Sequence, residues 1–259
     1  MRIAAFLVPF FALFAGAVGF YIRTQEQIHV FVADLPERGA LITYLLVAVS
    51  LLYAVFAIVF SAFVFLRRQS PRGFENAFGT DPLSYPFSFG LIGIAWLCAT
   101  IMYFFELRSH GQVPLVYIYF SVLSALSAIS VSYFAIEMYQ EPRRKSVFAL
   151  SLIPTLFMCF WLVLLYRQNA SNPILLSYAY YCLAIITSAL GFYFTSGFVY
   201  RKPSPPKTIF FYMLAIYFCF VTLADNHNMM INIIFGAILA MNVIYLSKLI
   251  RQLRYKQAT

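Results

Sequence analysis

Hydrophobic residues fall in eight long runs along the chain, and none of these runs contains a charged side chain. A helix needs about 20 mostly apolar residues to cross a hydrocarbon core about 30 Å thick. Unbroken runs of this length leave no alternating polar face for a barrel of the outer-membrane type. The pattern therefore predicts an all-α membrane protein with eight transmembrane helices, approximately at Ile3–Ile22, Leu41–Leu66, Phe87–Phe105, Pro114–Ile136, Val147–Tyr166, Ile174–Val199, Thr208–Ala224 and Met229–Ser247.

The composition agrees with this pattern. Of the 259 residues, 63% are hydrophobic and 10% are charged, whereas globular domains average about 45–50% and about 25%. An ordinary soluble domain and a disordered chain are both excluded by this balance.

The first run also has features of a secretory signal, because Arg2 precedes it and Ala15-Gly16-Ala17 resembles a cleavage site. The apolar residues continue through Val18 to Ile22, however, which makes the run long enough to span a bilayer. We therefore expect it to be the first transmembrane helix.

The basic residues are sorted between alternate connections. The N-terminus, the even-numbered connections and the C-terminal tail carry Arg2, Arg67, Arg68, Arg72, Arg143, Arg144, Lys145, Arg201, Lys202, Lys207, Lys248, Arg251, Arg254 and Lys256. The odd-numbered connections carry only Arg23, Arg38, Arg108 and Arg167. The positive-inside rule then predicts a multi-pass protein of the cell membrane with both termini in the cytoplasm. An even number of spans likewise requires both termini to lie on the same side of the membrane.

The net charge of +9 is explained by this asymmetry. We expect the basic face to contact anionic lipid headgroups and expect no nucleic-acid partner, because the basic residues are spread over five short segments. Oligomers or partner subunits are compatible with the pattern.

The predicted spans contain no ionisable residue except tyrosine and cysteine, and their only carboxamides are Asn232 and Asn242. Proton relays and charged-substrate sites usually place ionisable groups inside the membrane. Small residues instead recur every four positions, as in Ser124-Ala128-Ser132 and Thr187-Gly191-Thr195, which favours close helix packing. This interior favours a neutral or amphipathic ligand and predicts no cofactor.

The two halves of the chain share several features in the same order, which suggests a parallel duplication of four plus four helices. Pro9 and Tyr21 are spaced like Pro154 and Tyr166, and Leu41–Tyr44 resembles 175–178. The halves would be residues 1–140 and 141–259 of one membrane domain.

All three histidines fall in connections on the side opposite to the basic face, and two of them follow an acidic residue closely. An outward-facing ligand site is therefore predicted from Glu106, His110, Asp225, His227, Asn228 and Asn232. Carboxylates and imidazoles could position a water or act as acid and base, but no compact metal-binding motif is present. We expect no metal there.

Several short motifs of the second half are similar to those of a group of uncharacterised bacterial integral membrane proteins. They span about 100 residues and comprise Phe160-Trp161-Leu162, Tyr166-Arg167, Asn169-Ala170, Asn172-Pro173, Tyr178, Gly197-Phe198, Phe210-Phe211 and Leu223-Ala224-Asp225. The resemblance implies a bacterial source and carries no activity.

Three functions fit these observations. The first is a transport or permease-type protein for a neutral or amphipathic small molecule. The second is a membrane-embedded enzyme that acts on lipid-like substrates through the outward His/Asp/Glu site, and the third is a non-catalytic scaffold or sensor subunit.

The predicted orientation can be tested with reporter fusions. Alkaline phosphatase, which is active only outside the cytoplasm, should be active when fused after Arg38 or His110 and silent when fused after Lys145 or Lys207, because the basic connections stay inside. The reverse pattern of activity would show that the chain is inverted.

Overall fold

The protein is a bundle of packed helices. A computed structural model of the chain describes residues 2–28, 36–69, 74–78, 84–109, 111, 113–137, 150–170, 176–225 and 227–255. In these ranges the helices are α1 (Arg2–Gln27), α2 (Pro36–Arg67), α3 (Phe74–Phe78), α4 (Ser84–Ser109), α5 (Leu115–Glu137), α7 (Ile153–Asn169), α8 (Leu176–Val199), α9 (Pro205–Thr222) and α10 (Met229–Gln252).

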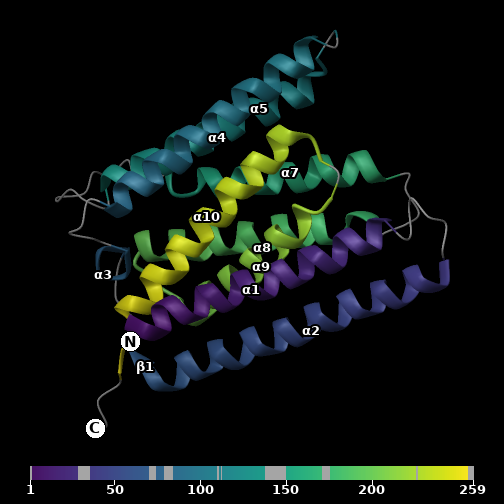
Figure 1. Ribbon diagram of the computed structural model, residues 1–259. Coiled ribbons are helices and arrows are strands. Elements are labelled where there is room, and N and C mark those ends of the chain that lie inside the picture. The colour runs from purple at the N-terminus through teal and green to yellow at the C-terminus, as the bar shows by residue number, and fades with distance from the viewer. Residues whose placement is uncertain are drawn as a thin grey trace.

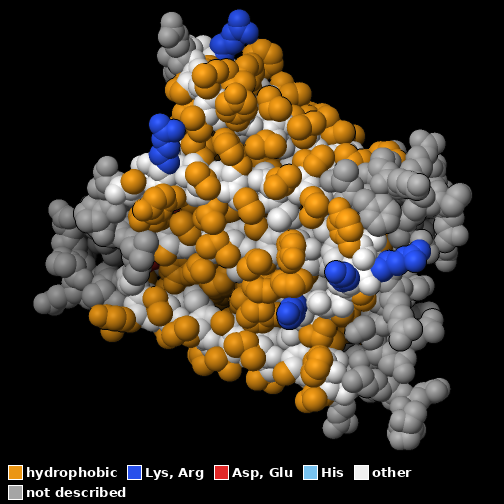
Figure 2. All heavy atoms as spheres, turned by 180° about the vertical axis from the view of Figure 1, so that it is seen from behind, with side chains coloured by type: hydrophobic (Ala, Val, Ile, Leu, Met, Phe, Trp, Pro, Cys, Tyr) orange, Lys and Arg blue, Asp and Glu red, His pale blue; other side chains and the backbone are white. Residues whose placement is uncertain are grey.

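Seven of the described helices are long and apolar enough to cross a membrane, namely α1, α2, α4, α5, α8, α9 and α10. This supports the prediction of a multi-pass, all-helical membrane protein. Hydrophobic side chains cover most of the described part of the face seen in Figure 2, and the few Lys and Arg side chains lie near its upper edge and in its lower right part. Such a surface suits contact with lipid chains, which are as apolar as the side chains.

The prediction of an eighth span at Val147–Tyr166 is not supported. Helix α7 begins at Ile153 and has 17 residues, so it is about 25 Å long, and Pro154 lies in its first turn. Its last turn is polar, with Arg167, Gln168 and Asn169. The apolar run is therefore longer than the helix that it forms, and the argument from an even number of spans no longer supports the orientation.

Helix α9 lies at the centre of the bundle and packs against α1, α2, α8 and α10. Helix α10 also contacts α1 and α4, while α7 lies between α5 and α8. In Figure 1 the α4–α5 pair and α2 lie on opposite sides of this centre. Because α9 is surrounded, nearly three quarters of its span is buried, 72% against 17% for α2.

The start of α1 and the C-terminal segment lie at the same end of the bundle (Figure 1). Two short strands, β1 (Arg68–Gln69) and β2 (Arg254–Tyr255), pair in antiparallel register there, with Arg68 opposite Tyr255. The C-terminal ends of α1 and α9 lie at the other end. The division at residue 140 and the duplication stay predictions.

Small residues allow the helices to approach closely, as the spacing of Thr187, Gly191 and Thr195 predicts. A Cβ atom on Gly191 of α8 would lie 2.8 Å from the ring of Tyr212 on α9. Similarly, a Cβ on Gly93 of α4 would lie 3.1 Å from the carbonyl oxygen of Ala128 on α5. These contacts hold α8 against α9 and α4 against α5.

Glycines on α1 bring it close to the central helix in the same way. A Cβ on Gly16 would lie 2.8 Å from the Cβ of Phe220, an atom that cannot move without its backbone. Gly90 of α4 is a matched control, since its Cβ would meet nothing within 4 Å.

We expect Gly16→Ala to lower stability by about 1–3 kcal/mol, because the added methyl group overpacks the contact between α1 and α9. Gly90→Ala should be neutral or stabilise by up to about 1 kcal/mol through helix propensity. Thermal unfolding of the detergent-solubilised variants, followed by tryptophan fluorescence, measures both. Equal melting temperatures for the two variants would contradict the close α1–α9 packing.

Candidate functional site

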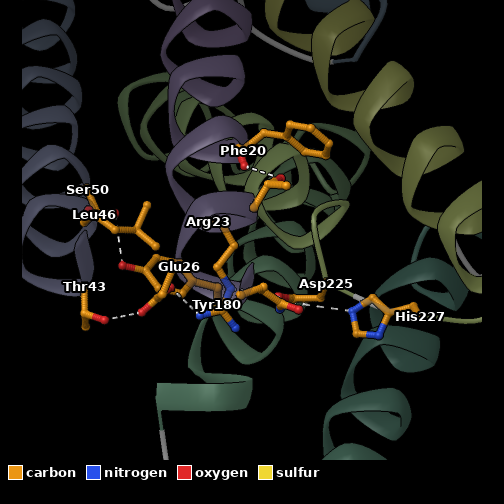
Figure 3. A network of polar contacts seen from close by, with 11 residues as sticks. Phe20, Arg23, Glu26, Thr43, Leu46, Ser50, Tyr180, Asp225 and His227 are labelled. Atoms are coloured by element: carbon orange, nitrogen blue, oxygen red, sulfur yellow. Dashed lines mark hydrogen bonds and ion pairs between the residues drawn. The ribbon is translucent and has the colours of Figure 1, made fainter. Parts of the chain in front are cut away.

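A cluster of charged side chains is buried at the end of the bundle where α1 ends (Figure 3). Helix α1 continues beyond its apolar run to Gln27, so Arg23 and Glu26 lie on the helix, with only 1% and 3% of their surface exposed. The expectation that the spans contain no charged residue was therefore wrong. The helix can continue because these two residues pair with each other and with residues of other elements.

The Arg23 guanidinium bridges two carboxylates. Its Nε donates to Asp225 Oδ1 at 2.8 Å, and its Nη1 donates to Glu26 Oε2 at 2.8 Å. It also lies 5.4 Å from the centre of the Tyr180 ring. Planar guanidinium groups suit such combined ion-pair and aromatic contacts.

Asp225 reaches this position because α9 ends at Thr222 and the chain turns there. The Asp225 N–H donates to the Thr222 carbonyl at 3.0 Å, and the His227 N–H donates to the Asp225 carbonyl at 2.7 Å. The Asp225 carboxylate also accepts a hydrogen bond of 2.7 Å from the Gln27 side chain. This turn therefore fixes a carboxylate against two residues of α1.

Helix α2 joins the cluster through hydroxyl groups. Thr43 donates a hydrogen bond to Glu26 Oε1. About two turns further along α2, the Ser50 hydroxyl lies 2.9 Å from the Tyr217 hydroxyl of α9 and 3.5 Å from the Tyr180 hydroxyl of α8. Four helices thus contribute polar groups that extend from the charged cluster into the bundle.

His227 lies at the edge of the cluster, half-buried beside an aromatic wall. Its Nε2 is 3.8 Å from Asp225 Oδ2, which is too long for a hydrogen bond, and this buried nitrogen has no hydrogen-bond partner among the described residues. The imidazole centre lies 4.4 Å from that of Tyr181, whose hydroxyl accepts from Trp161 at 2.9 Å. The His227 Nε2 atom is therefore a buried polar atom without a described partner.

Burial shifts the pKa values of Asp225 and His227 in opposite directions. Burial raises the pKa of Asp225, although Arg23 beside it acts in the opposite direction. Burial and the Arg23 charge together lower the pKa of His227 to about 4, so the imidazole is neutral at pH 7. Among the described residues, Arg23 is the basic residue that forms ion pairs with Asp225 and Glu26.

The six residues predicted for an outward site do not all belong to this cluster. Asp225 and His227 are members of it, whereas Glu106 accepts a hydrogen bond of 2.7 Å from the Asn228 side chain at the start of α10. Asn232 lies one turn along α10 and its buried Oδ1 has no described partner. His110 lies outside the described residues.

The arrangement offers acid–base and hydrogen-bonding groups and no evident metal site. In the part of the chain that the structure describes, no group of three or more His, Cys, Asp or Glu residues could hold a metal ion. Arg23 also places a positive charge next to Asp225, which disfavours a cation there.

The comparisons with known proteins do not assign the chain to a family. No family model matches the sequence, and neither a curated protein nor a solved structure is similar to it. The resemblance of the second-half motifs to bacterial membrane proteins stays a prediction.

Replacing Arg23 should be strongly destabilising, because it leaves buried carboxylates without a counter-charge. We expect Arg23→Met to lower the free energy of unfolding by about 3–5 kcal/mol, with Arg23→Lys intermediate because lysine keeps the charge but not the fork of donors. The double variant Arg23→Met/Asp225→Asn should recover part of the loss, as measured by thermal unfolding. Purely additive effects of the two substitutions would show that the residues are not coupled.

Proposed function

We propose that the protein is a transport or permease-type protein for a small amphipathic molecule, and that Arg23, Glu26, Asp225 and His227 form its polar binding site. The observation that carries this proposal is the burial of a charged cluster at the end of several membrane-length helices. Ionisable residues in such positions are costly and typically mark substrate or ion pathways.

The geometry supports ligand binding in two ways. The unpartnered His227 Nε2 lies near Asp225 Oδ2, and buried polar atoms are normally hydrogen-bonded. In addition, the hydroxyl groups of Ser50, Tyr180 and Tyr217 continue from the cluster toward the middle of the bundle. A ligand with a hydrogen-bonding head group would satisfy His227 and then meet further hydroxyls.

The cluster also changes the expected substrate. The sequence predicts a neutral or amphipathic small molecule because the predicted spans lack charge, and the buried Arg23 and Glu26 favour the amphipathic alternative. The unpartnered His227 Nε2 and the hydroxyl groups of Ser50 and Tyr217 favour a head group that forms hydrogen bonds. In the orientation with both termini in the cytoplasm of a cell, this site would face outward, and the basic end would contact anionic lipids.

Uptake into proteoliposomes tests this proposal. Purified protein is reconstituted and offered a panel of radiolabelled medium-chain amines, alcohols and carboxylic acids. We expect at least one compound to accumulate faster than in empty liposomes and Asp225→Asn to lower its initial rate about tenfold, the effect of about 1.4 kcal/mol. His227→Ala should lower the rate in the same direction.

A matched control separates function from folding. Thr100→Val removes a buried hydroxyl of α4 that bonds Ser124 and the Trp96 carbonyl, away from the cluster, and it should leave uptake unchanged. The proposal fails if no compound accumulates, or if Asp225→Asn and His227→Ala, folded as judged by size exclusion, transport like the unchanged protein.

A lipid-modifying enzyme is the second candidate, because a carboxylate beside an imidazole is a common arrangement for general-base catalysis. Asp225 and His227 provide that pair. Mass spectrometry of membrane lipids incubated with the protein would then detect a product that His227→Ala abolishes. Neither uptake nor product would favour the scaffold or sensor role, with partner subunits.

A further inference from the structure

An open pocket lies between α4 and the start of α10, on the membrane-facing surface. It has a volume of about 550 Å³ and is lined by Met102, Phe105, Glu106, Asn228, Met229 and Met230. Volumes of 300–1,000 Å³ are usual for small-molecule sites. The pocket is separate in its lining residues from the cluster of Arg23, Glu26, Asp225 and His227.

The walls of the pocket are apolar and adaptable. Met102, Phe105 and Met229 are 52%, 62% and 70% exposed, so lipid chains or a ligand must cover them in a membrane. Methionine side chains are flexible and polarisable, and they are used in surfaces that bind varied apolar ligands. Three of the six lining residues are methionines.

One carboxylate stands at the polar end of this apolar surface. Glu106 lies three residues before the end of α4, and Met102 lies one turn, about 6 Å, deeper along the helix axis. In the described part of the chain, Glu106 bonds the Asn228 amide and forms no ion pair with Lys or Arg. Among the described residues, the Glu106 carboxylate therefore has no basic partner, and it lies at the end of a helix of membrane length.

The orientation of this carboxylate is set by the start of α10. The Asn228 Oδ1 caps the helix by accepting from the Met230 N–H at 2.9 Å, so its amide nitrogen points toward Glu106. The positive end of the α10 helix dipole favours an ionised carboxylate nearby. The Glu106 carboxylate is thus held in place at the rim of the pocket.

We infer that this pocket binds an amphiphile with an ammonium head group, whose head contacts Glu106 and whose chain lies along Met102, Phe105 and Met229. Charge complementarity selects the head, and the apolar walls select the chain. The inference rests on the proposed function in one respect, since a transported amphiphile would first bind here at the membrane surface. Binding itself does not require transport.

The test measures binding of dodecylammonium to the full-length protein in a non-ionic detergent by native mass spectrometry. We expect saturable binding of one molecule, weakened about tenfold in Glu106→Gln, which keeps the shape of the side chain and removes the charge. Glu106→Lys should lose dodecylammonium and bind dodecyl sulfate instead. Arg108→Gln, an exposed charge change on the same turn outside the pocket lining, is the matched control and should bind like the unchanged protein.

Two results would overturn the inference. One is equal binding of dodecylammonium to the Glu106→Gln variant, and the other is equal binding of uncharged dodecanol to the unchanged protein. Displacement of dodecylammonium by short-chain phosphatidylethanolamine would support the ammonium chemistry and identify a lipid headgroup as its source. If dodecylammonium binds in a Glu106-dependent manner but no compound is taken up in proteoliposomes, the transport proposal alone is refuted. If uptake occurs and is lowered by Asp225→Asn but dodecylammonium does not bind, the pocket inference alone is refuted.

Discussion

The end of the bundle that carries the candidate site depends on one buried guanidinium. Arg23 has almost no exposed surface, and the cost of removing its charge from water is offset only because two carboxylates accept its N–H groups. One carboxylate lies on the same helix and the other follows the central helix. The ion pair with Asp225 therefore joins α1 to the turn between α9 and α10. Thr43 extends the connection to α2 through its hydrogen bond to Glu26.

Close helix packing and buried polar contacts together explain why α9 is so deeply buried. Helices α1 and α8 approach it through glycines, Gly16 and Gly191. Near its C-terminal end, Tyr217 is within hydrogen-bond distance of Ser50 of α2, and Asp225, just after the helix, accepts from Arg23 of α1. Lipid offers no hydrophobic driving force between helices, so close packing and hydrogen bonds hold them together. The charged cluster and the glycine contacts act on the same pair of helices.

Much of the fold could be predicted from the length of the apolar runs, since seven of them correspond to helices of membrane length. The prediction of a span in the apolar run around Pro154 was wrong, because apolar content does not determine where a helix starts. Arg23 and Glu26 were assigned to a connection for a related reason. Whether a helix continues through charged residues depends on partners, and Asp225 is some two hundred positions away in the sequence. The spacing of Arg23 and Glu26, three apart, was the only local sign that they share a helix face.

The predicted site residues lie in two places because the chain enters α10 directly after His227 and Asn228. His227 precedes the helix and faces the buried cluster, whereas the next residue, Asn228, caps the helix and holds Glu106 at the pocket. Adjacent residues thus serve a buried polar site and a lipid-facing one. A ligand head that competes with Asn228 for Glu106 would act on the same turn that sets the distance between His227 and Asp225. The start of α10 is therefore the element through which occupancy of the surface pocket would reach the buried cluster.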